Sequence, residues 1–375
     1  MKISVLAFDL SDNATGRAHL LAQLLAACHD VALVGPLFGN AIWRPLENSR
    51  IEYRGVPGHR HPRFLGQIPG LLRLIDGDVI VASKPRPTSF GLGLIARARR
   101  HRPLVLDIDD WELGFFYRAG RWGRLGRFLN VTNPNGLPWT WTMERLVRRA
   151  DAITVSSRFL AARFGGTVIP HVRDTQAWDP ARFDPAARRR ALGLEGSKVV
   201  MFLGTPRTYK GVDDLVAAVA AMSRDDVTLA LVGVEPGRHA TSAWAARPFV
   251  RLFPPIDFDD VPSYLMAADV VAVPQRATIE TLGQVPAKLF DAMALGRPVV
   301  STRVSMIPEI LSDCGVVVEP GQVSALAGAI ARLIDHPKEA QALGARARER
   351  CVERYSFEAA RRALFPLVER AMARR

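Results

Sequence analysis

The chain has 375 residues, of which 48% are hydrophobic and 23% are charged, and its formal net charge is +13. This composition excludes an intrinsically disordered chain, and no apolar run reaches the ~18 residues that a membrane-spanning helix needs. The length predicts two domains, and the positive charge predicts an anionic partner such as a phosphorylated substrate, an acidic lipid or nucleic acid.

In the first half of the chain, short runs rich in Val and Ile alternate with helical patterns. We expect strands near residues 2–8, 30–35, 78–83, 103–108 and 151–155, and helices near 15–28, 67–76, 88–100 and 139–150. Nearly continuous apolar strands separated by helices indicate a parallel sheet that is covered on both faces.

The second half repeats this alternation. We expect strands near residues 198–203, 227–232, 269–273, 298–302 and 315–318, and helices near 211–223, 260–268, 286–295, 304–312 and 322–335. The sequence therefore predicts an α/β protein with two doubly wound, Rossmann-like parallel-sheet domains that face each other across a cleft. The expected boundaries are residues 1–170 for the first domain, 171–196 for a linker, 197–355 for the second domain and 356–375 for a C-terminal helix that packs back toward the first domain.

The cysteines and the N-terminus bear on the compartment. Cys28, Cys314 and Cys351 are odd in number and form no CxxC pair, and the opening residues MKISVLAFDLSD contain no cleavage site. These features favour a reduced, cytoplasmic setting.

The segment FLGTPRTYKG, residues 202–211, follows an expected strand and precedes an expected helix. Gly204 permits a tight turn, Arg207 and Lys210 lie three residues apart, and the helix N-terminus adds partial positive charge. Only six of the 50 basic residues are Lys, and Lys84, Lys210 and Lys288 each follow an expected strand. The loop is therefore interpreted as a clamp for a diphosphate, with a basic surface loop as the alternative.

The segment PAKLFDAMALGRPVVS, residues 286–301, reads as a helix followed by a buried strand. Lys288 and Asp291 lie one turn apart on this otherwise apolar helix. A carboxylate can accept hydrogen bonds from the two hydroxyls of a ribose, and Lys can reach phosphate or sugar oxygens. A solvated helix edge is the alternative.

Together these two motifs resemble those of retaining glycosyltransferases of family 4, of bacterial type, which have the two-domain GT-B fold. The resemblance rests on Gly204…Arg207…Lys210-Gly211 and on ALGRPVV at 294–300, with support from DVPSYLMAADVVAVPQ at 260–275 and GVVVEPGQVSALAGAIARLI at 315–334. It covers residues 196–360 well and is weaker before them, where VIPHVRD at 168–174 has His171 in place of the usual Asn.

The resemblance implies that Arg207 and Lys210 neutralise the diphosphate of the donor, and that Asp291 binds the nucleotide ribose. It implies no metal and no further cofactor, the nucleotide sugar being a co-substrate. The family's first motif Glu falls on Gly283, which is a departure. Two residues are candidates to replace it: Gln284, which could bind the donor sugar, and Glu280, whose carboxylate lies at a different spacing.

The first domain is expected to supply the acceptor side, together with contacts to the donor from Gly16 and Lys84. DLSDNATGR at 9–17 lacks GxGxxG, which argues against a dinucleotide-binding dehydrogenase. In LVLDIDDWE at 104–112, we interpret Asp109, or Asp110 beside it, as a ligand of the acceptor hydroxyl or a base. The DxD pattern Asp107-Ile108-Asp109 leaves a metal site as the less favoured alternative.

FFYRAGRWGRLGRF, residues 115–128, interleaves Arg with aromatic residues and contains no acid. On a helix this pattern is typical of a segment lying on an anionic membrane surface, and an exposed loop whose aromatics pack inward is the alternative. No RNA- or DNA-binding motif is recognised, so nucleic acid is not expected as a partner.

The predicted function is transfer of a hexose-type sugar from a nucleotide-diphosphate donor to an acceptor hydroxyl with retention of configuration. The acceptor is expected to be a glycan or glycolipid, of the cell envelope or lipid-linked. The rivals are a catalytically weak nucleotide-sugar binding protein and a sugar-nucleotide epimerase of the same fold. The expected location is cytoplasmic, with peripheral attachment to the inner face of the plasma membrane as an option.

Overall fold

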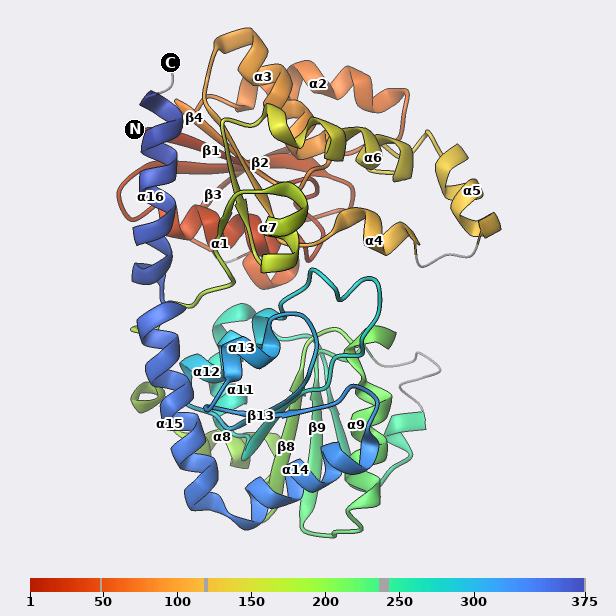
Figure 1. The fold of residues 1–375 in the computed structure, drawn as a ribbon, viewed down its shortest axis with the longest axis vertical. Coiled ribbons are helices and arrows are strands. Elements are labelled where there is room, and N and C mark those ends of the chain that lie inside the picture. The colour runs from red at the N-terminus through yellow and green to blue at the C-terminus, as the bar shows by residue number, and fades with distance from the viewer. Residues whose placement is uncertain (48, 118–120, 236–242, 374–375) are drawn as a thin grey trace. The chain divides into compact units, whose positions relative to one another are not determined.

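A computed structural model describes residues 1–47, 49–117, 121–235 and 243–373 of the chain (Figure 1). The chain divides into two compact units. Unit 1 comprises Met1–Pro170 with Ala360–Arg375, and unit 2 comprises His171–Ala359.

Unit 1 is built on a seven-stranded parallel sheet, counted over the described residues, with strand order β3-β2-β1-β4-β5-β6-β7. Its strands are β1 Lys2–Leu6, β2 Asp30–Leu37, β3 Glu52–Pro57, β4 Val79–Ser83, β5 Leu104–Ile108, β6 Ala152–Val155 and β7 Thr167–Val168. The central strands β1, β4 and β5 are buried along almost their whole length, as a sheet covered on both faces requires.

The helices of unit 1 connect these strands. They are α1 Thr15–Leu25, α2 Arg63–Leu74, α3 Leu92–Arg100, α4 Glu112–Tyr117, α5 Arg121–Leu129, α6 Leu137–Leu146, α7 Arg158–Phe164 and most of α16 Phe357–Ala373. A turn of π-helix, η2 Pro87–Gly91, precedes α3, and short 3₁₀ turns occur at η1 Arg44–Leu46 and η3 Val147–Arg149. Within this unit α5 stands away from the sheet, beyond α6 (Figure 1).

Unit 2 contains a six-stranded parallel sheet over its described residues, with order β10-β9-β8-β11-β12-β13. The strands are β8 Lys198–Leu203, β9 Val227–Val232, β10 Val250–Phe253, β11 Val270–Val273, β12 Val299–Thr302 and β13 Val316–Val318. The central register places Val200 of β8 between Leu229 of β9 and Val270 of β11.

The helices of unit 2 cover both faces of its sheet. They are α8 Pro185–Leu192, α9 Val212–Ala221, α11 Val261–Met266, α12 Ala287–Ala294, α13 Ile307–Leu311, α14 Val323–Asp335 and α15 Pro337–Arg354, with 3₁₀ turns at η4 Pro180–Arg182, η5 Thr208–Lys210 and η6 Phe258–Asp260. Alternate residues of β8 face opposite sides, so that Val199 packs in the same cluster as Leu289 of α12, and Val200 in the same cluster as Leu215 of α9.

Candidate functional site

The sequence-predicted residues of unit 2 gather where the strand order reverses. The chain proceeds from β8 to β9 on one side and later returns to β11 on the other side. Ligands of open parallel sheets bind at the carboxyl ends of the strands at such a switch point. Gly204, Arg207 and Lys210 lie in the loop after β8, and Gln284 lies in the loop after β11. Lys288 and Asp291 lie on α12, which follows that second loop.

Two glycines allow these segments to approach each other closely. Gly204 has φ of +133° and Gly211 has φ of +67°, conformations that L-residues rarely adopt. A Cβ atom at position 204 would lie 2.9 Å from Cε of Lys288, and one at position 211 would lie 1.9 Å from the carbonyl oxygen of Pro274. The loop after β8 therefore packs directly against α12 and against the loop after β11.

The three cationic side chains of unit 2 that were predicted from the sequence belong to this edge of the sheet. Arg207 is exposed, while Lys210 is half-buried and donates a hydrogen bond from Nζ to the carbonyl oxygen of Thr205 at 2.8 Å. Burial lowers the pKa of Lys288, although the charge of Asp291 opposes this shift. Among the described residues, the side chains of Arg207 and Lys288 form no hydrogen bond or ion pair. The edge is therefore suited to a ligand with more than one negative charge.

The loop after β11 also contains a buried amide that the sequence reading did not single out. Gln275 is 2% exposed, and its Nε2 donates a hydrogen bond to Oε1 of Gln284 at 2.8 Å. Its own Oε1 is buried and finds no hydrogen-bond partner among the described residues. Because a buried polar atom without a partner is costly, this oxygen is a candidate acceptor for a ligand hydroxyl.

Asp291, the residue predicted to bind ribose, lies buried in unit 2 and forms an ion pair with Arg173. The Arg173 guanidinium also donates to the carbonyl oxygen of Val172 and lies 5.4 Å from the ring centroid of Trp178. The pairing joins residues 118 positions apart, so sequence spacing could not reveal it. The ribose role of Asp291 stays a prediction.

At the switch point of unit 1, Lys84 sits inside a cluster of carboxylates. Its side chain is 2% exposed, and Nζ lies 2.6 Å from Asp109, 2.9 Å from Asp110 and 2.9 Å from Glu112. Arg86, next along the loop, pairs with Glu112 and donates to Thr140 Oγ1 at 2.8 Å. The ammonium of Lys84 is thus neutralised within unit 1, and its predicted contact with the donor remains a prediction.

The two acids of the DxD pattern, Asp107 and Asp109, each contact other side chains of unit 1. Asp107 is fully buried and accepts hydrogen bonds from Arg17 Nη2 at 2.8 Å and Thr154 Oγ1 at 2.7 Å. Oxygen atoms of Asp109, Asp110 and Glu112 lie within 4.8 Å of one another, as ligands of a cation would. Lys84 Nζ contacts all three carboxylates, so the ammonium already supplies the positive charge at that point.

Burial raises the pKa of Asp109 to about 7, with Asp110 and Asp107 adding to the shift and Lys84 opposing it. A carboxyl group with a pKa near neutrality can accept a proton at physiological pH. Gly16, the predicted donor contact, lies at the second position of α1, and that contact stays a prediction. A Cβ atom there would lie 3.6 Å from Cζ3 of Trp43, so this end of α1 is covered by the loop after β2.

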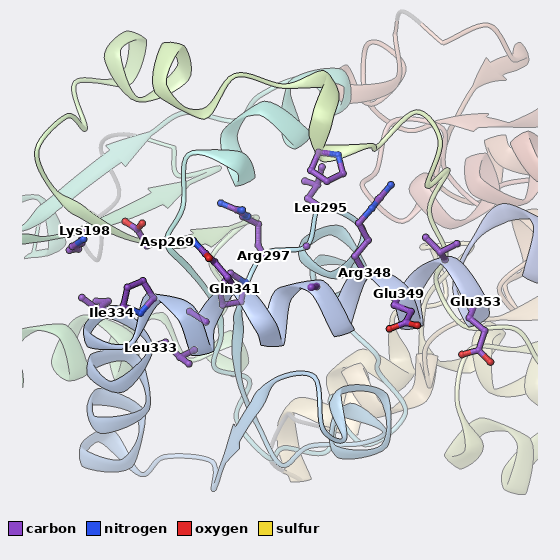
Figure 2. A pocket seen from close by; sticks show the side chains of 17 residues that line it. Lys198, Asp269, Leu295, Arg297, Leu333, Ile334, Gln341, Arg348, Glu349 and Glu353 are labelled. Carbon is purple, nitrogen blue, oxygen red and sulfur yellow. The ribbon is translucent and has the colours of Figure 1, made fainter.

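A cavity of unit 2 lies at the opposite edge of its sheet (Figure 2). It has a volume of about 820 Å³ and is bounded by the amino ends of β8, β11 and β12 and by α15. Figure 2 shows Asp269 and Arg297 on one side and Gln341 of α15 on the other. Asp269 accepts a hydrogen bond from the Val199 N–H at 2.7 Å and pairs with Arg189 at 2.9 Å. None of the sequence-predicted site residues lines this cavity, so we place the candidate site at the carboxyl edge.

Two glycosyltransferase families match this chain, one in each half. The family described as "Glycosyl transferase 4-like domain" matches residues 14–176, and "Glycosyl transferases group 1" matches residues 197–336. The solved structure of Alr3699/HepE from Anabaena, in complex with UDP and glucose, shares the fold with a TM-score of 0.76 and 20% identity over 98% of this chain and 99% of that one. The chain is a GT-B glycosyltransferase.

Curated relatives of this glycosyltransferase act on different acceptors. A GDP-mannose-dependent alpha-(1-6)-phosphatidylinositol monomannoside mannosyltransferase of Mycolicibacterium smegmatis is 29% identical over 366 residues, covering 89% of this chain and 88% of the relative. A D-inositol 3-phosphate glycosyltransferase of Saccharomonospora viridis is 32% identical over 251 residues, covering 61% of this chain and 54% of the relative. The family and the fold predicted from the sequence are confirmed.

In this glycosyltransferase, Gly204→Ala is expected to reduce the free energy of unfolding by about 1–3 kcal/mol, because alanine must adopt a positive φ and its Cβ meets Lys288. Gly328→Ala is the matched control. Gly328 is exposed within α14 and a Cβ there meets nothing within 4 Å, so alanine should stabilise by about 0.4–1 kcal/mol. Urea denaturation of the two variants measures both effects, and equal changes would show that Gly204 has no special backbone role.

Proposed function

We propose that this glycosyltransferase moves a hexose from a nucleoside-diphosphate sugar to a hydroxyl group of a glycolipid or envelope glycan, with retention of configuration. The donor diphosphate lies at the carboxyl ends of β8 and β11, against Arg207, Lys210 and Lys288. The observation that carries this proposal is the contact between Gly204 and Lys288, which brings cations from two separate segments to one edge of the sheet. The family resemblance supports retention.

The departing nucleotide gains negative charge as the bond to the sugar breaks. Cations held in place before the reaction stabilise that charge without reorganising, and this is usually the largest electrostatic contribution to catalysis. We assign this role to Arg207 and Lys210. In unit 1 we assign proton acceptance from the acceptor hydroxyl, or its positioning, to Asp109, whose pKa of about 7 suits either role.

The relatives guide the choice of donor. The M. smegmatis relative is GDP-mannose-dependent, and HepE was solved with UDP and with UDP-glucose. We therefore propose GDP-mannose as the first donor to test and UDP-glucose as the second. Incubation of each donor with phosphoinositide and polyprenyl-linked acceptors, followed by mass spectrometry, should give an acceptor heavier by one hexose. Formation of an epimerised donor without acceptor, or nucleotide binding without any transfer, would favour the two rival functions.

We also propose that Oε1 of Gln275, which has no hydrogen-bond partner among the described residues, contacts the donor sugar, and Gln275→Leu tests this contact. If Oε1 of Gln275 accepts a hydrogen bond from the bound sugar, its loss should reduce kcat/KM by about tenfold, in line with one hydrogen bond of ~0.5–1.5 kcal/mol. Gln341 is an exposed amide of α15 at the opposite edge of the sheet, so Gln341→Leu should leave kcat/KM unchanged. Steady-state kinetics with varied donor measures both, and equal values for the two variants would remove Gln275 from the site.

A further inference from the structure

A set of exposed apolar side chains lies on one outlying part of unit 1. Five of the largest exposed ones belong to α5, the loop after it and the first turn of α6: Leu125 (49% exposed), Phe128 (47%), Leu129 (67%), Val131 (52%) and Trp139 (38%). We call these five residues the α5 patch. Single exposed apolar residues are ordinary, but a contiguous group of this kind marks an interaction surface.

The members of the α5 patch are held next to one another. Leu125, Phe128 and Leu129 follow the i, i+3, i+4 spacing that places them on one face of α5. The Val131 N–H donates to the Leu129 carbonyl, and the Trp139 indole N–H donates to the Val131 carbonyl, each at 2.9 Å. A Cβ atom at Gly126 would meet nothing within 4 Å, so this side of α5 is also uncovered. The patch is thus a preformed apolar surface.

The charge around the patch is strongly positive. Between residues 115 and 149 the sequence has seven Arg and one acid, Glu144. The Glu144 side chain is 6% exposed and its carboxylate pairs with Arg163 at 3.4 Å, so it presents little negative charge to solvent. Two arginines that follow the patch in the sequence are exposed: Arg145 on α6 and Arg148 just after α6. The positions 118–120 of the predicted membrane segment lie outside the described residues.

We propose that the α5 patch inserts into the interface of an anionic lipid bilayer, with exposed arginines of the same unit, such as Arg145 and Arg148, on the phosphate headgroups. The nine residues of α5 are too few to cross a bilayer, which takes about 20, so the helix lies along the surface. Apolar side chains beside Arg and an interfacial Trp whose indole N–H is already hydrogen-bonded match the chemistry of that interface. No described helix is long and apolar enough to span a membrane.

Lipid is favoured over nucleic acid because the patch presents five exposed apolar side chains. Nucleic-acid surfaces instead place the cations at the centre, on the phosphate backbone. The proposal is also independent of the sugar donor, because none of the five residues of the α5 patch belongs to the proposed donor site. It can fail or hold without changing the proposed function.

Cosedimentation of the full-length chain with vesicles tests the proposal without any nucleotide sugar. The expected result is binding to phosphatidylcholine vesicles with about 30 mol% phosphatidylglycerol that is about tenfold or more tighter than to pure phosphatidylcholine, and weaker at high salt. The double variant Phe128→Gln/Leu129→Gln should lose about tenfold or more of this binding, since two apolar side chains no longer enter the bilayer.

Leu65→Gln is the matched control, because Leu65 is 56% exposed on α2 of the same unit but lies outside the patch. It should bind vesicles as the wild type does, and circular dichroism should show that all variants are folded. Absence of vesicle binding, equal binding to both kinds of vesicle, or an unchanged double variant would each overturn the proposal. Retention of RNA that the double variant loses, without vesicle binding, would overturn it in favour of nucleic acid.

Discussion

Lys210→Ala is expected to lower kcat by about 10²–10³-fold while the protein stays folded, because the ammonium group no longer stabilises the charge on the departing diphosphate. Lys210 lies in η5 immediately before Gly211, so its backbone position is fixed by the turn that packs on Pro274. The side chain is half-buried, and its Nζ donates a hydrogen bond to the carbonyl oxygen of Thr205 at 2.8 Å, in the loop that follows β8.

Two further variants separate this catalytic effect from a structural one. Lys338→Ala removes an exposed Lys from α15 and should leave kcat unchanged. Lys210→Arg keeps the charge but changes its shape, and should retain more activity than Lys210→Ala. Melting temperatures should agree among all three variants and the wild type. Near-normal turnover of Lys210→Ala, or a loss of activity that tracks a lowered melting temperature, would contradict the assignment.

The second large effect is expected at Lys84. Lys84→Met leaves the carboxylates of Asp109, Asp110 and Glu112 buried without the ammonium that contacts all three, and breaking a buried ion pair in this way costs about 3–5 kcal/mol. Because domains are stable by only about 5–15 kcal/mol, this change should bring unit 1 close to unfolding. Lys2→Met is the matched control, since its pair with Asp76 is solvent-exposed and should contribute little to stability.

The loss of folding stability caused by Lys84→Met should depend on pH. Burial alone would raise the pKa of Glu112, but the charges of Arg86 and Lys84 outweigh it and hold the pKa at about 2. Without Lys84 the pKa values of Glu112 and Asp109 rise in the folded state, and that of Asp109 moves further above its unfolded value. A folded-state pKa above the unfolded value gives stability at low pH that is lost as the pH rises. Urea denaturation should therefore show a larger deficit at about pH 8 than at about pH 5.

Adding Asp109→Asn to Lys84→Met should restore part of the lost stability, because one of the unpaired negative charges is removed. A Lys84→Met variant that unfolds at the same urea concentration as the wild type, or one whose deficit is equal at both pH values, would show that the cluster does not depend on Lys84.

Much of the fold could be predicted because the central strands are continuous apolar runs. The ranges 198–203 and 227–232 expected from the sequence coincide with β8 and β9. The sheets nevertheless have seven and six strands rather than about five each, because the edge strands β3 and β10 were not predicted. Both are partly exposed and mix charged with apolar residues, so they lack the apolar pattern of a buried strand. The two-residue strand β7 is too short to carry a pattern.

The candidate site could be predicted only in part. Local signals placed Gly204, Arg207 and Lys210 in one loop, because glycines and cations after a strand are visible in the sequence. The partners of the buried charges were not visible, since Arg17 and Asp107 lie 90 positions apart. Gln275 was missed for a different reason. Its importance comes from an unpartnered oxygen, and only the folded chain shows which polar atoms are left without a partner.

The central assignment is that the cations at the carboxyl ends of β8 and β11 hold the diphosphate of the donor. Isothermal titration calorimetry of nucleotide binding tests this assignment most directly. The wild type and Lys338→Ala should bind GDP or UDP with equal affinity. The double variant Arg207→Ala/Lys210→Ala should bind the same nucleotide at least about tenfold more weakly, a change of ~1.4 kcal/mol or more. Unchanged affinity in the double variant would place the diphosphate elsewhere and contradict the account.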